Sequence, residues 1–178
     1  MKIRSDLEAN SGKSGALNAL LYFLVNPGYM SAKLYRFYSW ADKRSFVLKA
    51  ASKLTWRFSI LVSSCHISPK SRLGDGLELP HPTGIVIGDG VEIGPNARIF
   101  QNVTIGQSGN TGQYPKIGCN VTIYAGVTIF GGIEIGDNCT IGANSVVNKS
   151  VLANSTVAGN PARPLSAMVS PPPLTGSS

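Results

Sequence analysis

The chain has 178 residues, 43% of them hydrophobic, which is enough apolar material for one buried core. Its formal net charge is +7, and residues 1–60 carry all of it, with ten basic and three acidic side chains. The polar start of the chain lacks the apolar segment of a signal peptide, and three cations interrupt the apolar run 46–62, which argues against a membrane-spanning helix. Three cysteines without metal-ligand spacing favour a reducing compartment. We therefore expect a cytoplasmic protein, with the inner face of the membrane as an alternative location.

Residues 1–63 read as a helical segment. Apolar residues at helical spacing predict helices over 16–25, 30–43 and 45–63, and Asn26, Pro27 and Gly28 end the first of them. We interpret the aromatic residues of this segment as packing that covers the next domain and helps subunits associate. Its basic side chains are compatible with a solvated face, an acidic partner or a peripheral membrane contact, and these alternatives stay open.

From residue 87 onward an aliphatic residue recurs at every sixth position, often followed by glycine. The series is Ile87, Ile93, Ile99, Ile105, Ile117, Ile123, Ile129, Ile135, Ile141 and Val147, and a shifted series precedes it at Ile67, Leu73, Leu79 and Ile85. Such a period suits one short strand and one corner of a parallel β-helix, whose coils bury their inner faces against one another. We predict a mainly β fold with this domain at 64–163 and a disordered tail at 164–178.

Two stretches break the repeat, at 80–84 and at 107–116. Regular coils are structural, so chemistry is expected where the pattern is interrupted. His81 lies in the first break, and a neutral imidazole is suited to act as a general base on a hydroxyl group. A purely structural histidine is the alternative.

Several motifs occur in a fixed order along the chain. They are SDLEA at 5–9, LYR at 34–36, HPTGIVIG at 81–88, QNVTIG at 101–106, PKIG at 115–118, IGANSVV at 141–147 and AGNPAR at 158–163. In this order they resemble the serine acetyltransferase group of hexapeptide acyltransferases. The resemblance implies a left-handed parallel β-helix with three hexapeptides in each coil, an exception to the usual right-handed crossover. It also implies a homotrimer that holds acetyl-CoA in the groove between adjacent subunits.

The same resemblance assigns roles to individual residues. The histidine that matches His81 removes the proton from the acceptor hydroxyl, and a backbone amide stabilises the oxyanion. Direct transfer is favoured over an acyl-enzyme, because no serine or cysteine stands beside His81 in an elbow-like motif. Coenzyme A contacts would come from Ala125, Ala143, Lys149, Pro161 and Arg163. For Ala125 and Ala143, an ordinary structural position in the coil is an equal alternative.

The chain also departs from the serine acetyltransferase pattern. The aspartate before the catalytic histidine is replaced by Pro80, and an Arg-His pair by Gln113 and Tyr114; Asp6 is retained as a candidate substrate ligand. The orienting aspartate is replaced by His66, which we expect to hold His81 through a hydrogen bond between two neutral imidazoles, with a degraded active site as the alternative. A free amino acid needs paired charges at its site, so these changes make serine a doubtful acceptor.

The short helical segment and the start at Asp6–Ser11 resemble the exopolysaccharide acetyltransferases of the colanic acid type. Tyr114, Tyr124, Gln113 and Asn102 suit a sugar ring, which is bound by stacking and neutral hydrogen bonds. We therefore expect the hydroxyl of a cell-surface polysaccharide sugar as acceptor. A serine O-acetyltransferase and a non-catalytic scaffold are the alternatives, and we expect no metal and no nucleic acid partner.

Overall fold

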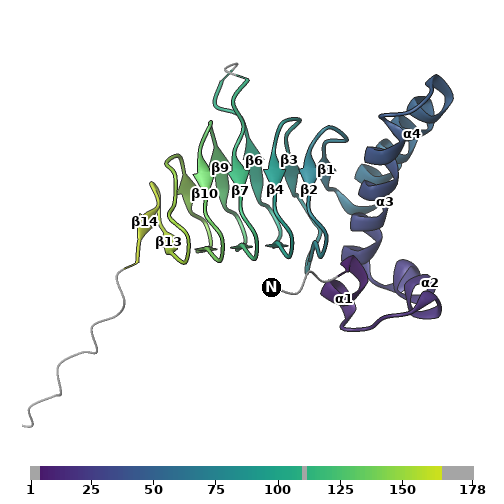
Figure 1. Ribbon diagram of the computed structural model, residues 1–178, viewed down its shortest axis with the longest axis horizontal. Helices are drawn as coiled ribbons and strands as arrows, with labels where there is room; N and C mark the ends of the chain where they lie inside the picture. Colours follow the sequence, from purple (N-terminus) through teal and green to yellow (C-terminus); the bar gives the residue numbers. More distant parts are fainter. Residues whose placement is uncertain (1–4, 110–111, 166–178) are drawn as a thin grey trace, which may run out of the picture.

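The computed structural model describes residues 5–109 and 112–165 of the chain. They form a parallel β-helix with four α-helices at its N-terminal end (Figure 1). The helices lie beyond the first coil, at the end of the β-helix opposite the last described residues (Figure 1). The predicted mainly β fold with an N-terminal helical segment is thus confirmed.

Three sheets form the three faces of the β-helix, here named A, B and C in the order in which each coil crosses them. Face A consists of β1 (His66–Ile67), β3 (Val86–Ile87), β6 (Thr104–Gly106), β9 (Thr128–Phe130) and β12 (Val146–Val147). Face B consists of β2 (Arg72–Leu73), β4 (Glu92–Ile93), β7 (Lys116–Ile117) and β10 (Glu134–Ile135). Face C consists of β5 (Arg98–Ile99), β8 (Thr122–Ile123), β11 (Thr140–Ile141), β13 (Thr156–Ala158) and β14 (Arg163–Pro164). All pairings are parallel except that of β13 with β14.

The strand register shows where the chain inserts extra residues between coils. Ile87 pairs with Ile105, so a regular coil takes 18 residues, or three hexapeptides. The pairing of Ile67 with Ile87 adds two residues, and the pairing of Ile105 with Ile129 adds six. These insertions coincide with the two breaks in the sequence repeat.

The aliphatic repeat positions point into the β-helix and form one continuous core. Those with almost no solvent exposure include Ile67, Leu79, Ile85, Ile87, Ile99, Ile105, Ile123, Ile129, Ile135 and Ile141. Burying each such side chain stabilises the fold by about 1.5–3 kcal/mol before chain entropy is subtracted. Cys139 is buried among them, as its place in the repeat predicts.

A row of asparagines connects four successive corners between faces B and C. Asn96, Asn120, Asn138 and Asn154 all have positive φ, which asparagine tolerates better than most residues. Each side-chain nitrogen donates to the side-chain oxygen of the next asparagine, at 3.0, 2.9 and 3.0 Å. The ladder therefore supports the corner backbone and ties the coils together.

The helices are α1 (Asp6–Ser11), α2 (Ala16–Val25), α3 (Pro27–Ala41) and α4 (Phe46–Ser63). The first was not predicted; it is a short helix stabilised by a capping box between Ser5 and Glu8. The third begins earlier than predicted, because Asn26 both ends α2 and caps α3 by accepting a hydrogen bond from the Tyr29 amide at 2.8 Å. Pro27 then occupies the first turn, where it needs no amide hydrogen.

An ion pair joins two of the helices to the first coil. Arg36 of α3 donates from Nε and Nη2 to the carboxylate of Asp6 in α1, at 2.9 and 3.0 Å. The remaining guanidinium donors reach the backbone oxygens of Leu73 and Gly74, and the Leu77 amide donates to Asp6 at 3.0 Å. One buried salt bridge thus fixes α1, α3 and residues 73–77 relative to one another.

Close backbone packing completes the attachment of α3. Tyr35 and Tyr38 are buried and donate their hydroxyl groups to the backbone oxygens of Ser71 and Ile67, each at 2.9 Å. Near the start of the helix, a Cβ at Gly28 would overlap the Leu79 backbone oxygen. Only glycine allows α3 to approach the coil this closely.

The expectation that the aromatic residues of residues 1–63 cover the first coil holds only in part. Trp56 packs against the core of the β-helix, whereas Phe37, Phe46 and Phe58 are exposed. At the other end, β14 and the hydrogen bond from the Leu165 amide to Thr156 extend regular structure into the predicted tail. The rest of that tail, residues 166–178, lies outside the described residues. No described helix has the length and apolar character needed to cross a bilayer.

Candidate active site

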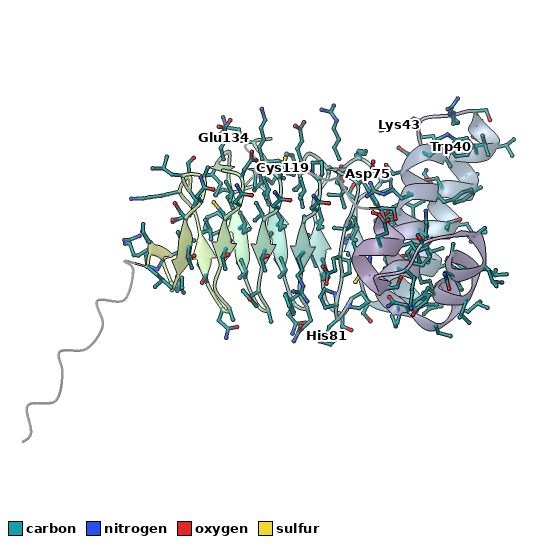
Figure 2. The ribbon with its side chains drawn as sticks, turned by 60° about the horizontal axis from the view of Figure 1, so that its bottom comes forward. Trp40, Lys43, Asp75, His81, Cys119 and Glu134 are labelled. Atoms are coloured by element: carbon teal, nitrogen blue, oxygen red, sulfur yellow. The ribbon has the colours of Figure 1, made fainter. Side chains whose placement is uncertain are left out.

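The two breaks in the repeat lie on different edges of the β-helix. The corners between faces C and A, here named the CA edge, are formed by residues 80–84, 100–102, 124–126, 142–144 and 159–161. The corners between faces A and B, here named the AB edge, include residues 107–115. Face A separates the two edges. Figure 2 shows His81 on the side of the molecule away from Asp75 and Cys119, which lie on corners between faces B and C.

His81 is exposed on the first corner of the CA edge. Pro80 and Pro82 flank it and restrict the backbone, and its carbonyl accepts a hydrogen bond from the Thr83 amide at 2.7 Å. A surface cavity of about 520 Å³ adjoins it, lined also by Pro27 and by residues 62–64 at the end of α4. The two-residue insertion thus projects an imidazole from an otherwise regular edge.

His66 lies elsewhere, with its side chain on face A. Its ring stacks on Trp56 of α4, with the centroids 5.0 Å apart and the planes inclined by 24°. Among the described residues no hydrogen bond joins His66 to His81. The prediction that His66 orients His81 therefore has no contact to support it, because tertiary packing gives its ring another partner.

Asn102 lies directly beside the corner of His81. Its amide donates to the Thr83 carbonyl at 2.9 Å, and its positive φ places it at the turn of the next coil. The neighbouring Gln101 has a buried side-chain oxygen without a hydrogen-bond partner among the described residues. The sequence did not single out Gln101, because its position in the repeat carries no chemical signal.

Gln113 and Tyr114 lie on the AB edge, on the far side of face A from His81. The Tyr114 ring covers Gly88 and Gly90, where a Cβ would press against or overlap the ring. Gln113 lies against Gly132 of the next coil, where a Cβ would come within 2.9 Å of its side-chain oxygen. A single chain therefore does not bring these two predicted substrate ligands to His81.

Asp6, another predicted substrate ligand, is only 6% exposed. Both of its carboxylate oxygens hold Arg36, and one of them also accepts the Leu77 amide. These contacts favour a structural role for the carboxylate over substrate binding, so Asp6 is left out of the site proposed below. The sequence could not show this pairing, because Arg36 is distant along the chain.

The predicted coenzyme A residues fall mainly on the CA edge, in coil order after His81. Ala125 and Ala143 occupy equivalent corner positions in successive coils, where the Asn144 amide donates to the Ala125 carbonyl at 2.8 Å. Pro161 lies at the next corner. Lys149 and Arg163 line a cavity of about 490 Å³ in the last coil. Ala125, Ala143 and Pro161 thus share the CA edge, whereas Lys149 lies on the corner between faces A and B and Arg163 lies in β14 of face C.

An aromatic row that the sequence analysis recognised only in part also lies on this edge. The Phe100 ring is 6.4 Å from His81 and stacks on Tyr124 with a centroid separation of 5.1 Å. Both residues occupy the position after the repeat aliphatic residue, where most hexapeptides of this chain have glycine. That exception was the available signal, and it marks two stacked rings beside the imidazole, with the Arg98 guanidinium 5.2 Å from the Phe100 centroid.

A larger cavity, of about 860 Å³, lies between α3 and face B and contains no predicted site residue. Trp40, Lys43 and Lys116 line it, together with Arg72, which pairs with Glu92 at 2.7 Å. Figure 2 shows Trp40 and Lys43 far from His81. Within residues 5–109 and 112–165, no group of three or more His, Cys, Asp or Glu side chains could hold a metal ion.

Comparison with known proteins agrees with the repeat and the fold. Residues 114–149 match the family model described as bacterial transferase hexapeptide (six repeats), and no curated protein matches the chain. Similar solved structures include soybean serine acetyltransferase complexed with serine, which is 34% identical with a TM-score of 0.79; the match covers 90% of this chain and 66% of that one.

Two bacterial structures are similar to the same degree. Neisseria gonorrhoeae serine acetyltransferase is 36% identical, with a TM-score of 0.78, and the match covers 90% of this chain and 63% of that one. Brucella abortus serine acetyltransferase in complex with coenzyme A is 34% identical, with a TM-score of 0.78 and coverage of 90% and 64%. The chain thus spans slightly less than two thirds of the length of these enzymes. The six-residue repeat, the three-faced β-helix and this likeness identify it as a hexapeptide-repeat protein with the fold of the serine acetyltransferases.

Proposed function

We propose that the protein is an acetyl-CoA-dependent O-acetyltransferase, in which His81 is the general base. The observation that carries this proposal is the CA edge, where an exposed imidazole is followed in later coils by three of the predicted coenzyme A residues, Ala125, Ala143 and Pro161. The likeness to serine acetyltransferases, one of them in complex with coenzyme A, supports the same reaction class. A scaffold without activity would not need an imidazole projected by an insertion.

The proposed reaction needs one proton acceptor and no covalent enzyme intermediate. A ring nitrogen of His81 accepts the proton of the acceptor hydroxyl as its oxygen bonds to the acetyl carbonyl carbon. The carbon–sulfur bond then breaks, and the imidazolium returns the proton to the coenzyme A thiolate. A positioned base of this kind typically accelerates transfer by about 10²- to 10⁴-fold.

The chain's own residues fit a long thioester along the CA edge. Neighbouring coils are about 4.8 Å apart, so four steps from His81 to Pro161 span roughly 19 Å. The cations Lys149 and Arg163 line one cavity in the last coil and suit phosphate groups.

We further propose that each site is shared by two subunits. Strand side chains on face B include Arg72, Glu92, Lys116 and Glu134, and those on face C include Arg98. The strands of face A carry no Asp, Glu, Lys or Arg; their outward residues include Val86, Thr104 and Val146. Face A is therefore the face best suited to surround a threefold axis. That arrangement places the CA edge of one subunit beside the AB edge of the next, and thus His81 beside Gln113 and Tyr114.

Two acceptors remain, and different observations favour them. The solved structures favour L-serine directly, because the similar enzymes are serine acetyltransferases and one of them is complexed with serine. The side chains of this protein favour a sugar hydroxyl. Asp6 is engaged by Arg36, the proposed acceptor side of the site offers neutral Gln113 and Tyr114, and Phe100 and Tyr124 present stacked rings next to His81.

The catalytic assignment is tested with the two histidines of the chain. Release of coenzyme A is followed for the wild type, His81→Ala and His66→Ala, with acetyl-CoA binding measured for each. We expect His81→Ala to lower kcat by about 10²- to 10⁴-fold while binding persists, and His66→Ala to have a much smaller effect. Equal turnover by His81→Ala and the wild type would show that the base is wrongly assigned and would favour a scaffold or binding role.

The acceptor is tested with L-serine and a panel of polysaccharide fragments. A sugar acceptor predicts ester formation on a fragment and weak turnover of serine. Efficient turnover of serine alone would establish the serine acetyltransferase activity and rule out the preference drawn from the side chains.

Sharing of the site between subunits is tested by mixing inactive variants. His81→Ala and Tyr114→Ala chains are unfolded together, refolded as mixed assemblies and compared with each variant refolded alone. A shared site predicts recovery of activity in the mixture, because one combination of edges is intact. No recovery in mixed trimers would place both residues of a functional site in one subunit.

A further inference from the structure

Helix α4 has the reverse of the polarity expected for a helix on a globular domain. Its buried residues are Ser52, Ser59 and Ser63. Its large apolar side chains point outward, with Phe46 87% and Leu61 81% exposed. Small buried residues allow α4 to lie close against α3, but they leave its apolar surface without a partner in the chain.

The outward apolar residues of α4 form a continuous stripe. Val47, Leu54, Phe58 and Leu61 are spaced at intervals of seven, four and three residues, which places them on one side of the helix. An isolated exposed leucine needs no explanation, but a row of this length on one helix marks an interaction surface.

Helix α2 has the same character at the same end of the molecule. None of its residues is buried, and it exposes Leu17, Leu20, Leu21, Leu24 and Val25. Both helices pack on α3, and Figure 1 shows them beyond β1, away from the C-terminal coils. We name the exposed apolar residues of α2 and α4 together the helical apolar surface.

The charged side chains of α2 and α4 themselves have a single sign. Lys49, Lys53 and Arg57 recur every four residues along one side of α4, and neither α2 nor α4 contains an acidic residue. A second copy of the surface would bring these cations against one another with no carboxylate to pair with them, which disfavours self-association. Anionic phospholipid offers both features that the surface requires, namely negative headgroups and an apolar layer beneath them.

We propose that the helical apolar surface docks on the surface of an anionic phospholipid bilayer. The helices lie in the headgroup layer and do not cross it, as their length and charges require. Leu54, Leu61 and the residues of α2 enter the acyl boundary, while the three cations of α4 contact headgroup phosphates. This proposal does not depend on the acetyl acceptor, since Leu54, Leu61 and the three cations of α4 have no part in the proposed catalytic step.

The test is flotation of the full chain with vesicles of phosphatidylcholine alone or of phosphatidylcholine and phosphatidylglycerol in equal parts. We expect binding to the anionic vesicles that weakens with added salt. Lys49→Glu/Lys53→Glu should weaken it by more than 25-fold, because each lysine near the surface contributes roughly fivefold. Leu54→Ser/Leu61→Ser should also release the protein, and both pairs are exposed, so circular dichroism should show unchanged folding.

Matched controls are Lys116→Glu on face B and Leu152→Ser in the last coil, where the leucine is 85% exposed. Both should bind vesicles like the wild type. Failure of the wild type to float with anionic vesicles, or equal loss of binding in the control variants, would overturn the proposal. So would self-association of the wild type in light scattering that Leu54→Ser/Leu61→Ser abolishes, since the surface would then join copies of the chain. Release of coenzyme A with a water-soluble acceptor is measured alongside vesicle binding. A failure of membrane docking is thereby distinguished from a failure of the proposed catalysis.

Discussion

Replacing Asp6 by asparagine tests whether this carboxylate binds the acceptor or holds the fold together. The amide keeps the size of the side chain but removes the charge that faces Arg36. The Arg36 side chain is 25% exposed and the Asp6 side chain 5%, so water can replace little of the lost interaction. The variant leaves a largely buried guanidinium without a counter-charge, with the backbone oxygens of Leu73 and Gly74 and the single amide oxygen of the new side chain as its acceptors.

Breaking a buried ion pair by removing one partner costs about 3–5 kcal/mol. In a chain of this length each kcal/mol lowers Tm by about 2–4 °C, so Asp6→Asn should unfold roughly 6–20 °C below the wild type. The assay is thermal unfolding followed by circular dichroism. Asp89→Asn is the matched control, because Asp89 is 52% exposed in its ion pair with Lys70 and its loss should cost less than about 1 kcal/mol.

The kinetic half of the test is measured well below the unfolding temperature. If Asp6 is a structural clamp, the folded variant should have an unchanged KM for the acceptor, and Arg36→Gln combined with Asp6→Asn should cost less than the sum of the two single changes. An Asp6→Asn protein as stable as the wild type, with a KM for the acceptor raised about tenfold or more, would refute this reasoning. Asp6 would then contact the acceptor.

Three further predictions concern other parts of the chain. Gly90→Val should displace the Tyr114 ring from the AB edge and raise KM for the acceptor while leaving acetyl-CoA binding unchanged; an unchanged KM would show that the ring position is irrelevant. Asn120→Gly, which keeps the positive φ, should break two bonds of the asparagine ladder and lower the free energy of unfolding in urea by about 1–3 kcal/mol, and no change would mean that the ladder is dispensable. The hydrogen bond and charge of Lys70 lower the pKa of Asp89. The ionised Asp89 carboxylate should therefore contribute its full stability above about pH 4, and this contribution should decline below that pH. Unfolding measured at a series of pH values should show the decline for the wild type and not for Asp89→Asn.

The β-helix was predictable because its core repeats every six residues and each repeat makes the same local contacts. The register places Ile87 opposite Ile105, as three hexapeptides in a coil require. The insertions could also be counted from the sequence. Their positions on two different edges follow from the same count, but the distance between them became clear only once the faces were assigned.

The helical segment was less predictable because tertiary contacts decide its details. Asn26 and Pro27 are signals for both the end of one helix and the start of the next, and only the capping contact to Tyr29 shows that both apply. The burial of serines and exposure of leucines on α4 contradicts the usual rule for globular domains. Periodicity identifies the faces of a helix, but it does not say which of them faces the protein.

The candidate site residues also fall into two groups, those whose positions the repeat predicts and those whose positions depend on long-range contacts. His81, Ala125 and Ala143 share an edge because their positions in the repeat are equivalent, and this placement can be predicted by counting hexapeptides in the sequence. The pairing of Asp6 with Arg36 and the stacking of His66 on Trp56 join helices to coils and follow no sequence period. Asp6 and His66 were assigned to the site by resemblance, and the structure gives each of them another partner.

The helical apolar surface and the proposed base meet at one cavity, and this contact links the two proposals. The cavity beside His81 is lined by Pro27 at the start of α3 and by Val62 at the end of α4, one residue beyond Leu61 of the apolar stripe. A protein docked through α4 would hold this corner next to the headgroup layer. An acceptor carried on a lipid would then reach His81 without leaving the membrane, whereas free serine would gain nothing from docking. Anionic vesicles should therefore accelerate acetylation of a lipid-linked sugar and leave turnover of a water-soluble acceptor unchanged. Equal effects of the vesicles on both acceptors would show that membrane docking does not select the acceptor.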